Sequence, residues 1–416
     1  MDLKSFKRPA IFVGLLFSLS LTVGCATYQG KVAQSRQALA DHDYDKALKG
    51  LQPLAEKADG DQLVYLLDYA TALQIAGNYK ESNTAFLKAD HLSELLDYHS
   101  ISRQAGSLLL NQEMVQYKGD TFEKIFINGY LAMNYLEIGM LDDALVEARR
   151  INEKFVKYRQ EEKKAFELNP FSKYLSALIW EANKNYDDAY LAYSEAYKID
   201  SSIGPIREDL VRSAKLARRN DAYLEWKKQF PEVKENKSWY DKSLGELIVI
   251  FQQGWGPRKA PQQNEYRLPA LVPVSSSTKL ARLNIEGGES YGSTLIYDVQ
   301  AAAIKTLRDD YAILVAKRIA AIAAKAVAAD QVRQKNKLLG DLTFIALSMS
   351  DRADLRQWSL LPQSIQMIRV PLKPGKYKFN IEGVEFSGVS SGEKLTDQEV
   401  EIKAGKKQFV VWRSLK

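Results

Sequence analysis

Cysteine and histidine are almost absent from this chain: its 416 residues contain one cysteine, Cys25, and three histidines. A single cysteine excludes a disulfide framework, so the fold depends on a hydrophobic core. The histidines fall in no HExxH pattern, and the chain has no glycine-rich phosphate loop. We therefore expect no histidine-based metal site, no cofactor and no enzymatic activity.

The N-terminus has the organisation of a secretory signal. A basic segment precedes an apolar stretch over residues 10–21 that is too short to span a bilayer comfortably. The stretch leads into the sequence LTVGCA, which resembles a lipobox. The resemblance implies that residues 1–24 are a signal peptide, that Cys25 carries the acyl chains, and that Ala26 directs sorting to the outer membrane. The alternative is an ordinary secretory peptide that leaves Cys25 as a free thiol.

The charge of the remaining chain is low. Removal of residues 1–24 lowers the formal net charge from +6 to +4, which is too weak to indicate nucleic acid as a partner. After the signal, the most apolar stretch is 311–329, but charged side chains interrupt it, so we expect no transmembrane helix. The length is enough for two domains.

Residues 28–230 repeat a pattern of apolar and small residues that resembles the tetratricopeptide repeat. The small residue that lets the second helix of each unit approach the first recurs at Ala47, Ser82, Ala144 and Ala189. The spacing of these positions is uneven, which indicates insertions, one of them over 94–122. We predict an irregular TPR-like α-solenoid over residues 25–235.

Such an array presents a concave surface that suits peptides or partner proteins, although it could also serve only as a scaffold for the C-terminal half of the chain. Arg149 and Arg150 are candidate contacts for an acidic ligand, but such a pair is also typical of a solvated helix face. Tyr117, in the segment Tyr-Lys-Gly-Asp, is a third candidate contact with a partner.

The periodicity changes after Pro231. Residues 247–251 form a β-branched and aromatic run that is typical of a strand buried on both faces. Residues 294–337 are predicted to form one long helix, whose basic residues suit either a packed helix or one lying on a lipid surface. We predict the α+β class overall, with a mixed α/β region at 240–362 and a separate antiparallel β module at 363–416.

The densest candidate site in this half is the segment around Asp354, Arg356 and Trp358. In an extended segment these alternating side chains point to one side, where a carboxylate, a guanidinium and an indole would form one polar cluster. Trp255 and Arg258 belong to the same candidate region. A structural ion pair capped by an aromatic ring is the interpretation that we favour.

Together, the lipobox, the repeats and the Asp354 segment resemble a family of uncharacterised repeat-containing lipoproteins of Gram-negative bacteria. The resemblance implies a location but no activity. Our leading hypothesis is a periplasmic adaptor, anchored in the outer membrane, that holds a periplasmic or outer-membrane protein during envelope assembly. The alternative is a cell-wall factor that regulates peptidoglycan synthesis or binds glycan through the Trp255 and Trp358 regions.

Overall fold

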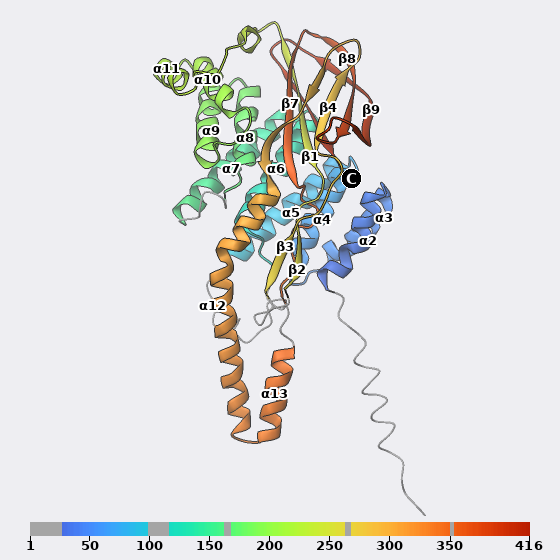
Figure 1. Ribbon diagram of the computed structural model, residues 1–416, viewed down its shortest axis with the longest axis vertical. Helices are drawn as coiled ribbons and strands as arrows, with labels where there is room; N and C mark the ends of the chain where they lie inside the picture. Colours follow the sequence, from blue (N-terminus) through green and yellow to red (C-terminus); the bar gives the residue numbers. More distant parts are fainter. Residues whose placement is uncertain (1–26, 99–115, 162–167, 263–267, 350–352) are drawn as a thin grey trace, which may run out of the picture.

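The computed structural model describes residues 27–98, 116–161, 168–262, 268–349 and 353–416. The predicted signal peptide, Cys25 and most of the predicted insertion at 94–122 lie outside these residues. The first half of the described chain is helical, and the second half consists of strands and one helical hairpin (Figure 1). The predicted α+β class is confirmed.

The helices of the first half form five consecutive antiparallel pairs. They are α2 (Tyr28–Ala40) with α3 (Tyr44–Glu56), α4 (Gln62–Ile75) with α5 (Tyr79–Tyr98), α6 (Thr121–Glu137) with α7 (Leu141–Gln160), α8 (Pro170–Ala182) with α9 (Tyr186–Ile199), and α10 (Ile206–Leu216) with α11 (Asn220–Gln229). The predicted small residues Ala47, Ser82, Ala144 and Ala189 are all buried on the second helices. The sequence therefore identified the TPR-like solenoid correctly.

Each pair turns through one residue in the left-handed region, two positions after the end of its first helix. Two of these residues are Gly77 and Gly139, and the other three are His42, Lys184 and Arg218, with φ between 57° and 64°. Only glycine adopts this conformation without a steric penalty. The same turn thus recurs in all five pairs, with or without glycine.

The second half is built on two four-stranded sheets. One has the order β10-β1-β7-β6, from β1 (Gly245–Gln253), β6 (Thr294–Asp298), β7 (Ser364–Leu372) and β10 (Lys407–Arg413); the other has the order β5-β4-β8-β9, from β4 (Leu280–Ile285), β5 (Ser290–Gly292), β8 (Gly375–Val384) and β9 (Ser390–Ile402). A separate hairpin pairs β2 (Arg258–Pro261) with β3 (Pro269–Val272), and a 3-10 turn, η5 (Lys237–Tyr240), precedes β1.

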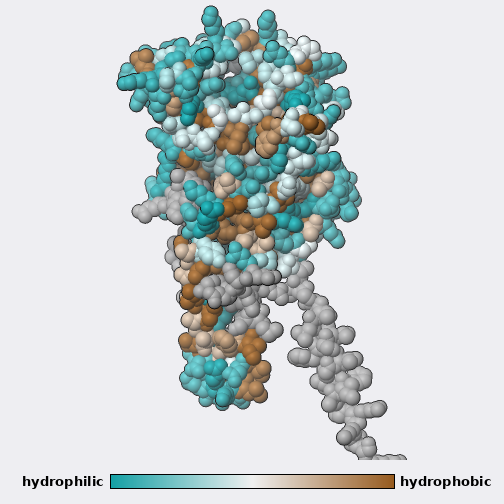
Figure 2. Space-filling model, viewed as in Figure 1, coloured by the Kyte–Doolittle hydropathy of each residue, from teal (hydrophilic) through white to brown (hydrophobic). Residues whose placement is uncertain are grey.

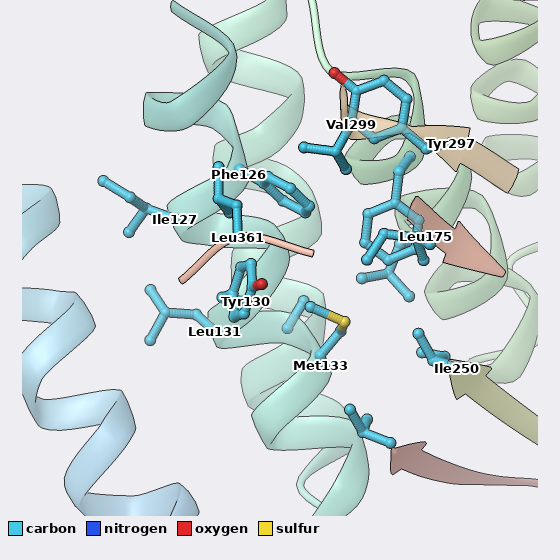
Figure 3. Packing of buried hydrophobic residues seen from close by; sticks show 14 of the residues in the cluster. Phe126, Ile127, Tyr130, Leu131, Met133, Leu175, Ile250, Tyr297, Val299 and Leu361 are labelled. Atoms are coloured by element: carbon cyan, nitrogen blue, oxygen red, sulfur yellow. The ribbon is translucent and has the colours of Figure 1, made fainter. Parts of the chain in front are cut away.

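Strand β1 is buried on both faces, as its sequence predicted. Leu247, Val249 and Phe251 pack with the second sheet, whereas Ile248 and Ile250 belong to the core that the first sheet shares with the helical array. Figure 3 shows this shared core from close by: side chains of α6 point towards residues of β1, of α8 and of the segment before β7. The array and the sheets therefore have one continuous hydrophobic core.

Two predictions about this half are wrong. Residues 363–416 are not a separate module, because β10 pairs in parallel with β1, β7 pairs with β1 and β6, and β8 pairs with β4. The long helix, α12 (Val299–Arg333), does not begin at Thr294, because residues 294–298 form strand β6. A short apolar run can form either a strand or a helix. Here the pairing with β7 makes residues 294–298 a strand.

Helix α12 continues far beyond the sheets and returns through α13 (Lys337–Met349). The two helices pack against each other and project from the body of the molecule as a hairpin (Figure 1).

Candidate functional site

The segment 353–362 lies against α2, α4 and α6, which are the first helices of the first three pairs of the array. Trp358 is its anchor, with an indole that is 1% exposed. The indole Nε1–H donates to Thr71 Oγ1 at 2.8 Å, and the ring packs 5.0 Å from Tyr130 and 5.7 Å from Phe86 between centroids. Trp358 is thus part of the shared core.

Two buried carboxylates bind the backbone of this segment. Glu123 accepts the Trp358 N–H at 3.1 Å, and Asp68 accepts the N–H groups of Ser359 and Leu360 at 2.9 and 3.1 Å. Burial raises the pKa of Asp68 to about 6 and that of Glu123 to about 7. The array therefore binds the segment 353–362 of its own chain through three backbone N–H groups.

Arg356 forms the predicted ion pair with Asp354. Its guanidinium donates to Asp354 at 2.9 and 2.7 Å and to Asp61 of the array at 2.8 Å, and it lies 5.7 Å from the ring centre of Tyr117. The indole of Trp358 contacts the array instead of this ion pair. The structure brings Asp354, Arg356 and Tyr117 together and places Trp358 deeper, which agrees with the structural interpretation of the cluster.

A cavity of about 680 Å³ opens beside this ion pair. Its walls come from the start of α6, the β2–β3 hairpin, the segment 354–361 and the first part of α12. Four of the predicted site residues, Tyr117, Asp354, Arg356 and Trp358, line it. No sequence pattern indicated that α12 would close one side of this site.

A second cleft, of about 1050 Å³, contains a charge network that the sequence did not reveal. Three cations from different elements meet three carboxylates there, in bridges that include Arg212 to Asp209, Arg369 to Asp209 and Lys407 to Glu181 at 2.6, 2.7 and 2.9 Å. The remaining carboxylate, Glu246 of β1, bonds Arg369 at 2.7 Å. Because three positive charges face three negative charges, we interpret the network as a set of structural ion pairs that connects the array to the first sheet.

The remaining predicted residues lie apart from the cavity lining. Arg149 is exposed on α7 beside Trp180, and Arg150 pairs with Glu147 at 3.4 Å. Trp255 is buried, and its Nε1–H donates to the Leu415 carbonyl at 2.8 Å. The side chain of Arg258 is exposed on β2. Cys25 lies outside the described residues, so the structure does not bear on its acylation.

Among the residues that the structure describes, the projecting hairpin carries the largest group of exposed apolar side chains. Eight large residues on it are between 40% and 70% exposed: Ile313, Ile319, Ile322, Val327, Leu338, Leu339, Leu342 and Ile345. Figure 2 shows apolar surface along the hairpin and polar surface at its tip. Lys325, by contrast, is 1% exposed.

Features of an enzyme are sparse in the described chain. Within the described residues, no group of three or more His, Cys, Asp and Glu side chains could hold a metal ion. The pattern Gly-x-Ser-x-Gly occurs at 288–292 and 388–392, but each copy begins in a turn between two strands and continues into the second strand, whereas a nucleophile elbow needs a strand-to-helix turn. None of the helices that are described combines the length and the apolar character needed to cross a membrane.

No protein-family model matches the chain, and no curated protein matches it. Among solved structures, a tetratricopeptide repeat protein from Parabacteroides merdae is 15% identical, with a TM-score of 0.33 over 49% of this chain and 67% of that one. MamA from Desulfovibrio magneticus RS-1 is 17% identical, with a TM-score of 0.30 over 48% and 88% of the two chains. Such a likeness identifies neither a family nor a function for this chain.

Proposed function

We propose that this protein is a periplasmic lipoprotein, anchored in the outer membrane, that acts as an adaptor and binds a protein partner of the cell envelope through the α12–α13 hairpin. The anchor part rests on the sequence around Cys25. The adaptor part rests on the apolar surface of the hairpin.

The single observation that carries the adaptor is that each arm of the hairpin has one stretch that is almost entirely apolar and yet largely exposed. Residues 319–329 contain one charge, Lys325, which is buried, and residues 338–345 contain one, Asp341, which pairs with Arg333 at 2.7 Å. A helix that is hydrophobic all round is normally buried. The hairpin therefore needs a cover that the rest of the described chain does not provide.

A protein partner fits this surface better than a bilayer. Eleven residues of α-helix are about 16 Å long, roughly half of the hydrocarbon core. The tip carries Arg333, Lys335 and Lys337, and each cation costs roughly 3 kcal/mol at the bilayer centre. The alanines of residues 319–329 leave room for another helix to approach closely, so a helical protein surface is the complementary partner.

The side of the array formed by α2, α4 and α6 does not serve this role, because the protein's own segment 353–362 lies against it. Glycan binding through tryptophan loses its support for a similar reason. Trp255 and Trp358 are 7% and 1% exposed, so neither ring offers a face on which a sugar could stack. Regulation of peptidoglycan synthesis is compatible with an adaptor and depends on which partner is bound.

Site-specific photo-crosslinking in intact cells tests the adaptor. A photoreactive residue at Val327 or Leu342 should yield one discrete crosslinked protein, and the crosslink at Val327 should be lost when Leu338 and Leu342 are changed to Ser. Leu224, which is 63% exposed on α11, is the matched control position and should give no such product. Crosslinks to lipid alone, or equal products at Leu224, would contradict the proposal.

The anchor is tested separately. Cys25→Ser should abolish labelling by a fatty-acid analogue and release the protein from membranes. If this variant stays membrane-bound, another segment anchors the chain.

A further inference from the structure

The 680 Å³ cavity between the array and α12 has the size of a small-molecule site, since such sites measure roughly 300–1,000 Å³. Apolar side chains from four parts of the fold make up much of its lining. The apolar lining includes Phe122, Leu271, Leu307, Leu314, Trp358 and Leu361. An apolar lining of this kind favours a hydrocarbon chain over a polar ligand.

Several polar groups of the lining are already engaged within the protein. Arg356 is bound by Asp354 and Asp61, and Glu123 accepts bonds from Tyr117 Oη at 2.7 Å and from the backbone. The Gln357 side chain bonds the carbonyl of Pro257 at 2.7 Å. A bound peptide would need partners for its N–H and C=O groups, which these side chains do not offer.

Two lysines of the lining, unlike these polar groups, are not engaged by other described residues. Lys118 precedes α6 and Lys317 lies on α12, and neither has an ion-pair or hydrogen-bond partner among the described residues. Burial lowers the pKa of Lys118, and so does the positive charge of Lys124; Asp97 acts in the opposite direction, and Lys317 adds a smaller lowering. An anion placed between Lys118 and Lys317 would relieve this repulsion.

We propose that the cavity binds a free single-chain anionic amphiphile, a long-chain carboxylate, with its chain along the apolar lining and its head group between Lys118 and Lys317. None of the eight exposed apolar residues of the hairpin lines this site, although Ala321 belongs both to its lining and to the apolar stretch 319–329. Its occupant is a small molecule, and the adaptor function does not depend on it.

Fluorescence titration with cis-parinaric acid tests this site. The full chain carrying Cys25→Ser is used, because loss of the anchor removes the need for detergent. Lys118→Gln and Lys317→Gln should each weaken binding about tenfold, the magnitude expected for a lost charge-assisted contact. Lys335→Gln, at the hairpin tip outside the cavity, is the matched control and should bind like the parent chain.

Two further measurements separate the chain from the head group. The methyl ester of cis-parinaric acid lacks the charge, so it should bind more weakly than the acid, and its affinity should not change in the lysine variants. Ala303→Phe, which places a ring in the lining, should weaken both ligands. Absence of binding to the parent chain, equal affinities for acid and ester, or a double lysine variant that binds the acid normally would each overturn the proposal.

Discussion

Three carboxylates, of which Asp68 and Glu123 are buried and Glu137 is half-buried, connect the array to the second half of the chain at the residue scale. Asp68 and Glu123 accept backbone N–H groups of the segment 353–362, and Glu137 of α6 accepts the N–H of Val411 on β10 at 2.5 Å. Burial raises the pKa of Glu137 to about 7, and burial also raises the pKa values of Asp68 and Glu123. These contacts should therefore make stability depend on pH near neutrality.

Glu137 gives the clearest test of this dependence. Its pKa is about 7 in the folded state and near 4.3 in the unfolded state, so the folded protein takes up the proton first as the pH falls. The free energy of unfolding should rise between pH 8 and pH 5, by roughly 2 kcal/mol relative to Glu137→Gln, which does not titrate. Urea unfolding of both proteins across this range measures the difference. Parallel pH profiles would show that Glu137 does not contribute.

The left-handed turns supply a second prediction. Arg218 is exposed and has φ of 57°, a conformation that costs a residue with a Cβ about 1 kcal/mol. Arg218→Gly should raise the free energy of unfolding by roughly 1 kcal/mol. Gly77→Ala, at the equivalent turn and with no atom within 4 Å of the added Cβ, should lower it by a similar amount. If both variants lower the stability, side-chain contacts rather than φ determine the effect. Thermal unfolding measures both.

The sequence predicted the contacts of the candidate residues only where the partners are close together along the chain. The Asp354 to Arg356 ion pair joins residues two apart, and its spacing was visible in the sequence. The third partner, Asp61, and the position of Trp358 against Thr71 depend on contacts between residues that are 295 and 287 positions apart. No periodicity within one segment carries that information.

At the scale of elements, features that depend on residues close together in the sequence were again predictable, and features that depend on distant residues were not. The helix pairs follow from apolar spacing and small residues within about 35 positions, and the both-face burial of β1 follows from its uninterrupted apolar run. The parallel pairing of β1 with β10 joins strands about 160 residues apart. An alternating pattern identifies a strand but not its neighbour, which is why residues 363–416 looked like an independent module.

The segment 353–362 behaves as an element of the core rather than as a loop. Trp358→Ala should lower the free energy of unfolding by about 3–5 kcal/mol, because it leaves a large cavity between α4 and α6. Trp358→Phe keeps part of the volume and should cost less. Chemical denaturation of the two variants measures this order. A Trp358→Ala protein of normal stability but altered binding would instead make the segment a functional site.

At the scale of the whole molecule, the hydrophobic core and the charge network both cross from the array to the sheets. The core includes Phe126 and Leu175 of the array together with Ile250 and Met367 of the first sheet. The charge network adds Arg369 of β7, which bonds Asp209 of α10. The two halves of the chain differ in sequence periodicity, but they pack together as one unit.

This unity predicts the behaviour of the array alone. A chain of residues 25–235 would expose the sides of α4, α6 and α8 that face the sheets, and Asp68, Glu123 and Glu137 would lose the backbone donors that the second half supplies. Hydrophobic surface of that extent favours aggregation. We expect this fragment to bind a hydrophobic dye and to unfold without a cooperative transition, and coexpression with residues 236–416 should restore a stable complex. A monodisperse fragment that melts cooperatively would show that the array folds independently and that its side formed by α2, α4 and α6 can be vacated to receive a partner.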